Sequence, residues 1–203
     1  MDLKERFYIH LSKYTNTEKI SLLWGHLFKS YTESHREYHN LNHLEELFNY
    51  FDHYQDSIQN KSAVALSIFY HDVVYQVWKK NNEQKSAEKA IEILQEIRFP
   101  YEDLKIIEDL IMCTKNHASL TPDQGFMIDF DLAILGQKND IYNIYSQQIR
   151  KEYKIVPELI YNKGRKQVLT HFLEKESIFQ TSIFKSKYEI QARINLTKEL
   201  DQL

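Results

Sequence analysis

The stretch Ala63–Tyr70, read with the two residues that follow it, is AVALSIFYHD. It is the most apolar part of the chain, and it is far shorter than the roughly 18 apolar residues of a membrane span. An apolar run of this length, without regular alternation, is typical of a buried core helix. The run ends at His71 and Asp72, whose side chains can both bind a metal ion. We therefore expect a core helix with chemically reactive groups at its end.

Helical periodicity continues along the chain on both sides of this stretch. The 203 residues include only 4 Gly and 3 Pro, too few for the many turns of a sandwich or barrel. No segment alternates with a period of two. We predict an all-α fold with residues 1–203 in one domain. The expected helices cover a stripe at 22–30, then about 40–54, 62–72, 81–99, 104–114, 121–136, 139–156, 158–175 and 186–201.

Several residues are of the types that begin or end helices. Thr15 with Glu18 fits a capping box, and Ser62 can cap the core helix. Thr121, Pro122 and Gln124 together form a strong start signal, and Gly136 is a plausible C-cap.

Charge and composition exclude several functions. The net charge is only -3, so no basic field favours a nucleic-acid polymer or an anionic membrane. Cys113 is the only cysteine, and the charged start Met1–Arg6 lacks the apolar stretch of a signal peptide. We expect a cytoplasmic protein, and the sequence leaves its oligomeric state open.

Three short segments combine polar side chains with apolar neighbours: Tyr38–His43, Phe69–Asp72 and Ile128–Leu132. A buried His or Asp must be paired, hydrogen-bonded or bound to metal, because its desolvation is otherwise costly. Two imidazoles and two carboxylates suit a divalent ion such as Mn, Fe, Co, Ni, Zn or Mg. The His-Asp dipeptide alone is weak evidence. With 9 His and 11 Asp in 203 residues, the number of such dipeptides expected by chance is roughly 0.5.

The ordered set His43, His71-Asp72 and Asp131 resembles the HD superfamily of metal-dependent phosphohydrolases. Residues 38–43, YHNLNH, are similar to a motif of cyclic nucleotide phosphodiesterases in which the second His binds metal and the first protonates the leaving oxygen. Residues 130–133 resemble the segment that holds the last Asp ligand. The larger catalytic apparatus of those enzymes is absent, so a cyclic nucleotide substrate does not follow.

Nearly the whole chain also resembles a group of bacterial HD phosphohydrolases without a settled substrate. The similar segments are 39–43, 69–75, 82–87, 129–136, 149–153 and 164–165. The resemblance implies an all-helical enzyme in which a metal-activated water hydrolyses a phosphate ester. The implied substrate is a small phosphorylated metabolite or nucleotide.

The resemblance implies that His43, His71, Asp72 and Asp131 bind the metal. Neighbouring helical residues point about 100° apart, so His71 and Asp72 can reach one ion only near a helix end. Asp129 is the alternative to Asp131, and because the two lie on different helix faces, one of them should face away. We favour Asp131 from the resemblance.

His39 lies one helical turn before His43, so both can share a face. A histidine can protonate a departing alkoxide near neutral pH, which makes His39 the candidate general acid. The alternative is that His39 only bonds backbone at the helix start.

Further candidates are weaker. Glu83 could accept a hydrogen bond from a metal-bound water or simply complement a helix dipole. Ser86 shares its helix face and could contact substrate, and His117 could touch substrate or a second metal, unless it is a surface residue. The candidate phosphate ligands are Arg36, Lys115, Arg150 and Arg165, because guanidinium groups bind phosphate in a bidentate manner and a lysine ammonium binds it as a point charge.

Two alternative functions stay open. One is a di-iron oxygenase of the HD type, which needs additional histidines for the second iron. The other is a non-catalytic module that binds nucleotide or metal.

Overall fold

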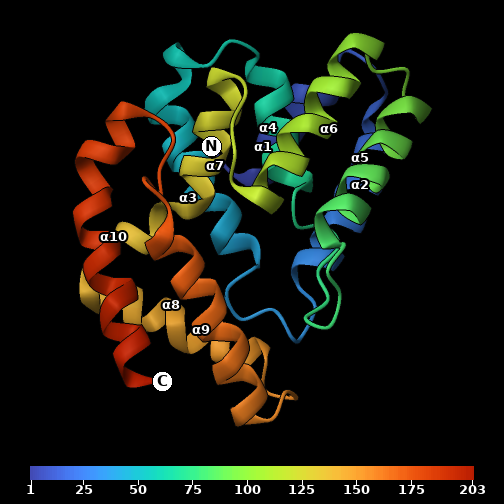
Figure 1. Cartoon of the computed structure of the whole chain (residues 1–203). Helices are drawn as coiled ribbons and strands as arrows, with labels where there is room; N and C mark the ends of the chain where they lie inside the picture. Colours follow the sequence, from blue (N-terminus) through green and yellow to red (C-terminus); the bar gives the residue numbers. More distant parts are fainter.

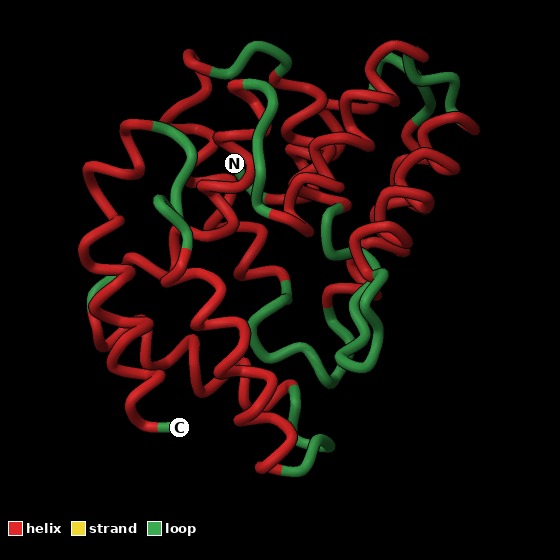
Figure 2. The backbone as a smooth tube through the Cα atoms, viewed as in Figure 1, coloured by secondary structure: helices red, strands yellow, loops and turns green.

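The computed structural model describes residues 1–203, and its secondary structure consists of helices joined by short loops (Figure 2). There are ten α-helices and two short 3-10 helices, and no strand. This confirms the all-α prediction. The helices are α1 (Leu3–Leu11), α2 (Thr17–Tyr31), α3 (Leu41–Tyr54), η1 (Gln55–Ser57), α4 (Lys61–Tyr70), α5 (Asn82–Glu96), α6 (Tyr101–Asn116), α7 (Pro122–Leu132), η2 (Ala133–Gly136), α8 (Asn139–Glu152), α9 (Glu158–Glu174) and α10 (Ser182–Gln202).

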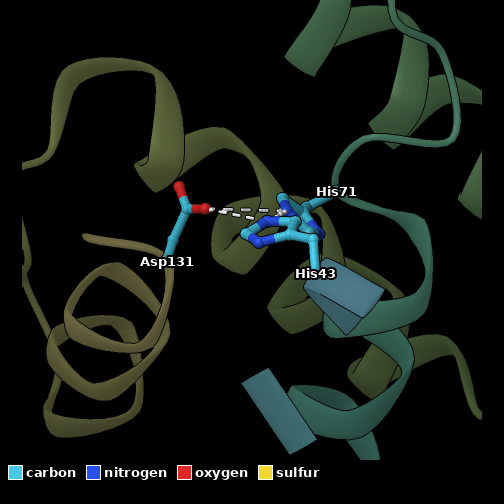
Figure 3. Close-up of side chains that lie close together, drawn as sticks. All are labelled: His43, His71 and Asp131. Carbon is cyan, nitrogen blue, oxygen red and sulfur yellow. Dashed lines mark hydrogen bonds and ion pairs between the residues drawn. The ribbon is translucent and has the colours of Figure 1, made fainter. Parts of the chain in front are cut away.

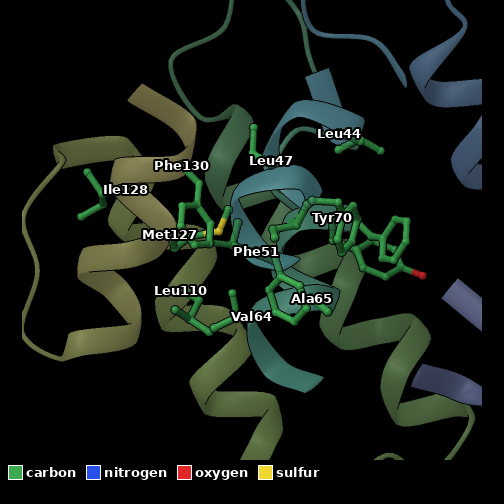
Figure 4. Packing of buried hydrophobic residues seen from close by; sticks show 14 of the residues in the cluster. Leu44, Leu47, Phe51, Val64, Ala65, Tyr70, Leu110, Met127, Ile128 and Phe130 are labelled. Atoms are coloured by element: carbon green, nitrogen blue, oxygen red, sulfur yellow. The ribbon is translucent and has the colours of Figure 1, made fainter. Parts of the chain in front are cut away.

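Helix α4 lies at the centre of the molecule, as the apolar stretch predicts. Every residue from Ala63 to Tyr70 is buried, and α4 contacts α1, α3, α5, α6 and α7. Figure 1 shows α5 and α6 together on one side and α8, α9 and α10 on the other. Figure 4 shows side chains from several of these helices meeting around α4. One continuous hydrophobic cluster extends from Leu3 to Leu196, so all ten α-helices share a core.

Several helix boundaries differ from the prediction. Asn16 caps α2 by accepting from the Lys19 N–H, so the capping box at Thr15 and Glu18 is wrong. Asn60, and not Ser62, caps α4. In both cases an asparagine close by is an equally good cap, and the hydrophobic stripe alone does not choose between neighbouring caps.

Other helix boundaries also differ from the prediction. Helix α1 lies where no helix was predicted, α8 ends at Glu152, and α10 begins at Ser182, earlier than expected. The capping box of Thr121 and Gln124 is confirmed at the start of α7.

Gly136 is not a left-handed C-cap. It ends η2, and no glycine in the chain has a positive φ. A Cβ at this position would lie 2.5 Å from the Cβ of Tyr188, so glycine is needed for the close contact between η2 and α10. None of the helices combines the length and the apolar character needed to cross a bilayer.

Candidate metal centre

Three side chains from different helices converge beside the end of α4 (Figure 3). His43 comes from the first turn of α3, His71 caps the C-terminus of α4, and Asp131 lies in the last turn of α7. One ligand atom from each lies within 4.8 Å of the other two. Both imidazoles are buried, and the Asp131 side chain is 19% exposed. The fold therefore brings together residues separated by up to 88 positions.

The distances within this group fit a shared ion. Nε2 of His43 lies 3.3 Å from Nε2 of His71 and 3.3 Å from Oδ1 of Asp131, and the third distance, His71 to Asp131, is 3.8 Å. Ligand atoms about 2.1 Å from one ion are about 3.0 Å apart at a right angle and about 3.4 Å apart at a tetrahedral angle. A buried group of this size and composition can hold a metal ion.

A hydrogen bond of His71 directs its other ring nitrogen toward the candidate metal position. Its Nδ1 donates to the carbonyl oxygen of Ile68 at 3.0 Å, so the neutral ring has its lone pair on Nε2, facing the other two residues. His43 lacks such support, because its buried Nδ1 has no hydrogen-bond partner. Its ring instead packs against the ring of Tyr38, with centroids 4.8 Å apart.

The electrostatics of the group favour a positive charge. Burial lowers the pKa of His43. Burial opposes protonation of His71 as well, but Asp72 and Asp131 outweigh it and raise the pKa of His71 to about 9. Burial would raise the pKa of Asp131, but its hydrogen bond to His43 and the charge of His71 hold that pKa below its usual range. The carboxylate thus stays charged and attracts a proton or a metal ion.

Asp72 lies beside this group. Its Oδ2 is 3.3 Å from Nε2 of His71 and 4.0 Å from Nε2 of His39, but the residue is outside the three-membered group. Helix α4 ends at Tyr70, which allows Asp72 to turn toward its neighbour. The expected helix end next to the His-Asp pair is therefore confirmed.

His39 is held by Glu152, a residue to which the sequence analysis gave no role. Oε2 of Glu152 lies 2.8 Å from Nδ1 of His39 and accepts a 2.6 Å hydrogen bond from the Tyr75 hydroxyl. Oε1 accepts the backbone N–H groups of three consecutive residues, Glu37, Tyr38 and His39. The alternative for His39, a ring that only bonds backbone, does not agree with this arrangement.

Glu152 and His39 stabilise each other's charged forms. Burial of Glu152 is outweighed by the hydrogen bond and charge of His39, and the pKa of Glu152 falls to about 2. Burial opposes protonation of His39, but Glu152 and Asp72 outweigh it and raise its pKa. Nε2 of His39 can therefore carry a proton next to the metal centre. A lone glutamate in the amphipathic pattern of 139–152 gives no local signal for this role.

Arg36 has a different role from the predicted one. Its side chain is wholly buried and donates to the carboxylate of Glu33 and to the carbonyl oxygens of His39, Asp72 and Val73. It is therefore not available to a substrate phosphate. Arg36 instead ties the loop before α3 to the end of α4, which positions both His39 and Asp72.

Arg150 and Ser86 also make structural contacts. Arg150 donates to the carbonyl oxygens of Tyr153 and Val156 after the end of α8. Ser86 is buried and bridges the N–H and the carbonyl of Val74. Both side chains are engaged in these structural contacts, so the prediction that they bind substrate gains no support from the geometry.

Glu83 and Lys115 are not linked to the metal centre. Glu83 is half-buried at the start of α5, Lys115 is exposed near the end of α6, and neither forms a hydrogen bond or ion pair. Their predicted roles gain no support from the geometry.

His117 and Arg165 do come near the centre. Both line a cavity of about 160 Å³ that also reaches Asp131 and His39. His117 is the C-cap of α6 in the left-handed conformation, and burial lowers its pKa to about 4, so its ring is neutral. Arg165 is buried, and its Nε and Nη2 donate to Glu199 at 2.7 and 2.9 Å.

Asp129, the alternative to Asp131, points away from the centre. It accepts from the N–H of Gln180 and from the N–H and hydroxyl of Thr181, before α10. The choice of Asp131 is thus supported by geometry. Comparison of the chain with protein-family models, with curated proteins and with solved structures found no match.

Proposed function

We propose that this protein is a metal-dependent phosphohydrolase of the HD type, acting on a small phosphate ester. The proposal rests on one observation, which is that two groups of side chains lie next to each other. One is the metal centre of His43, His71 and Asp131, and the other is His39, whose ring Glu152 holds beside it. The resemblance of the ordered motifs to HD phosphohydrolases supports the same conclusion.

The proposed ligands are His43, His71, Asp131 and, from the side of His39, Asp72. The mixed nitrogen and oxygen set suits Mn, Fe, Co, Ni, Zn or Mg. A divalent ion held there would lower the pKa of a coordinated water, so that hydroxide is available near neutral pH. His43 and His71 contribute neutral nitrogen donors, and the two carboxylates contribute the charge that retains a dication.

His39 supplies the proton for the departing oxygen. Its Nδ1 is hydrogen-bonded to Glu152, and its Nε2 lies 4.0 Å from Asp72, on the side of the metal centre. Although burial opposes it, Glu152 and Asp72 raise the pKa of His39 above its ordinary value, which favours the ring with a proton on Nε2. Tyr75 stacks on the His39 ring with centroids 4.3 Å apart and fixes its plane. Together these contacts orient one proton toward the leaving group.

The test is metal analysis of the purified protein, combined with hydrolysis of 4-nitrophenyl phosphate and a panel of phosphorylated metabolites and nucleotides in each metal. We expect bound metal and metal-dependent phosphate release. His39→Ala should keep the metal and lower kcat by about 100- to 1,000-fold, because only the general acid is removed. His26→Ala, on an exposed part of α2, is the matched control and should change neither value.

Other outcomes identify other functions. Metal binding without turnover of any phosphate ester would contradict the proposal and favour a binding module. Two irons per chain with oxygen consumption would indicate an oxygenase.

A further inference from the structure

The cavity beside the metal centre bears on the substrate. It is bounded by η2, α8, α9 and α10, and at one end it reaches Asp131 and His39. A phosphate held at the metal centre would therefore have its leaving group directed into this space. The inference below rests on the proposed function, because it concerns the substrate of the same site.

The walls of the cavity are apolar. Nine of its thirteen lining residues are hydrophobic, and three of these, Leu169, Phe172 and Leu196, are buried in the core. No Asn, Gln, Ser, Thr or Lys lines it, and the only hydroxyl groups among the lining residues are those of Tyr38 and Tyr145. A nucleobase placed here would lose the hydrogen bonds that its ring atoms make with water, and an apolar group would lose none.

The charged groups of the cavity also favour an apolar ligand over a nucleotide. Arg165 is the only guanidinium, and Glu199 already neutralises it through two hydrogen bonds. His117 has a neutral ring. Apart from His39 at the metal end, no free cation is available for a second phosphate, as a nucleoside diphosphate or triphosphate would require.

The volume indicates the size of the group that the cavity can enclose. The cavity holds about 160 Å³. An apolar cavity of about 150 Å³ accommodates one benzene molecule. A nucleoside is far larger, whereas an alkyl chain of about four to six carbons or a single phenyl ring fits.

A second hollow of similar volume includes His43 in its lining and is more polar, with Asn40, Asn42 and Glu46 in its walls. It includes neither Asp131 nor His39. A substrate there would be out of reach of the proton donor, so the apolar cavity is the better leaving-group site.

We infer that the substrates are phosphate monoesters of small, apolar alcohols, with the alkyl or aryl group bound between η2, α9 and α10. A hydroxyl on that chain could form a hydrogen bond with the ring of His117 or with the hydroxyl of Tyr38 or Tyr145, which also line the cavity.

The first test is a homologous series of n-alkyl phosphates from methyl to octyl, measured with the metal-loaded protein. These esters share almost the same leaving-group pKa, so differences in kcat/KM report binding of the chain. We expect kcat/KM to rise about 4-fold per methylene up to about five carbons and then to fall. Adenosine monophosphate should be a poorer substrate than butyl phosphate.

Binding without turnover gives an independent readout. By isothermal titration calorimetry, n-butylphosphonate should bind at least about 10-fold more tightly than methylphosphonate. Val168 lies at the mouth of the cavity and is 45% exposed, so Val168→Phe can narrow it without disturbing the core. This variant should lose at least about 10-fold in affinity for butylphosphonate and leave methylphosphonate within about 2-fold. Leu159→Phe, on the same helix and 84% exposed, is the matched control.

The outcomes separate the two proposals. Hydrolysis that is independent of chain length, or that is faster for nucleotides, would overturn the substrate class and leave the phosphohydrolase intact. Metal binding with no ester hydrolysed would overturn the phosphohydrolase and the substrate class with it.

Discussion

Asp129 and Asp131 lie two residues apart on α7, and their surroundings are opposite in kind. Asp129 is fully buried and accepts three hydrogen bonds from Gln180 and Thr181, at 2.6 to 2.8 Å. Asp131 faces the Nε2 atoms of two histidines. Backbone N–H groups always donate, whereas an imidazole nitrogen donates only when it is protonated and otherwise binds metal.

The comparison shows how a structural carboxylate differs from one that can bind a ligand. The hydrogen bonds of Asp129 are made within the protein, and they join α7 to the start of α10. The two histidine nitrogens that face Asp131 can instead bind either a proton or a metal ion. Substitutions at both aspartates, the pH dependence of metal affinity and a substitution of Glu152 test this distinction.

Asp131→Asn should lower metal affinity by at least about 1,000-fold and abolish hydrolysis, because a charged ligand becomes a neutral amide of the same shape. Folding should be retained, since the side chain is partly exposed and makes no backbone hydrogen bond. Titration calorimetry with the metal and circular dichroism measure both effects. Unchanged metal affinity would remove Asp131 from the ligand set.

Metal affinity should depend on pH. Because the carboxylates raise the pKa of His71 to about 9, the metal must displace a proton below that pH. Affinity should fall about tenfold per pH unit, or about 100-fold between pH 9 and pH 7. Without metal, the raised pKa contributes stability that is fully present below pH 6.5 and is lost as the pH rises through 9. Added metal should therefore raise Tm more at pH 9 than at pH 7, and a constant affinity over this range would contradict the assignment.

Glu152→Gln should lower kcat about 10-fold with metal content unchanged. The amide oxygen can still accept the three backbone N–H groups, but the amide nitrogen cannot accept the proton on Nδ1 of His39. The pKa of His39 should fall, and the alkaline limb of the pH–rate profile should move to lower pH. NMR titration of the His39 ring checks the cause. A lower kcat with an unshifted profile would indicate a purely structural role for Glu152.

Asp129→Asn should have the smallest effect on function, with metal affinity and kcat changed by less than about 2-fold. The free energy of unfolding should fall by about 1–3 kcal/mol, because the Thr181 N–H loses its acceptor. Urea unfolding measures the loss. The same substitution two residues apart would thus separate stability from metal binding, and loss of metal in this variant would break the comparison.

Part of the candidate site was predictable from local patterns. The islands around His43, His71 and Asp131 combine polar ligands with apolar neighbours, and the three side chains meet as expected. Arg36 and Glu152 show the limit. Arg36 was a candidate for phosphate and instead donates to the carbonyl oxygens of nearby His39 and of the distant Asp72 and Val73. Glu152 reaches His39 across 113 positions.

The helical fold, the buried α4 and the residues able to bind metal could be predicted from the sequence, because periodicity, apolar runs and side-chain chemistry are local properties. Local patterns do not determine which of two neighbouring aspartates faces the histidines, which arginine is buried among carbonyl oxygens, or which glutamate bonds to His39. These depend on how helices pack, and a rotation or shift of one helix by a single residue exchanges the faces that meet. Long-range packing therefore selects the working site from the candidates that the sequence offers.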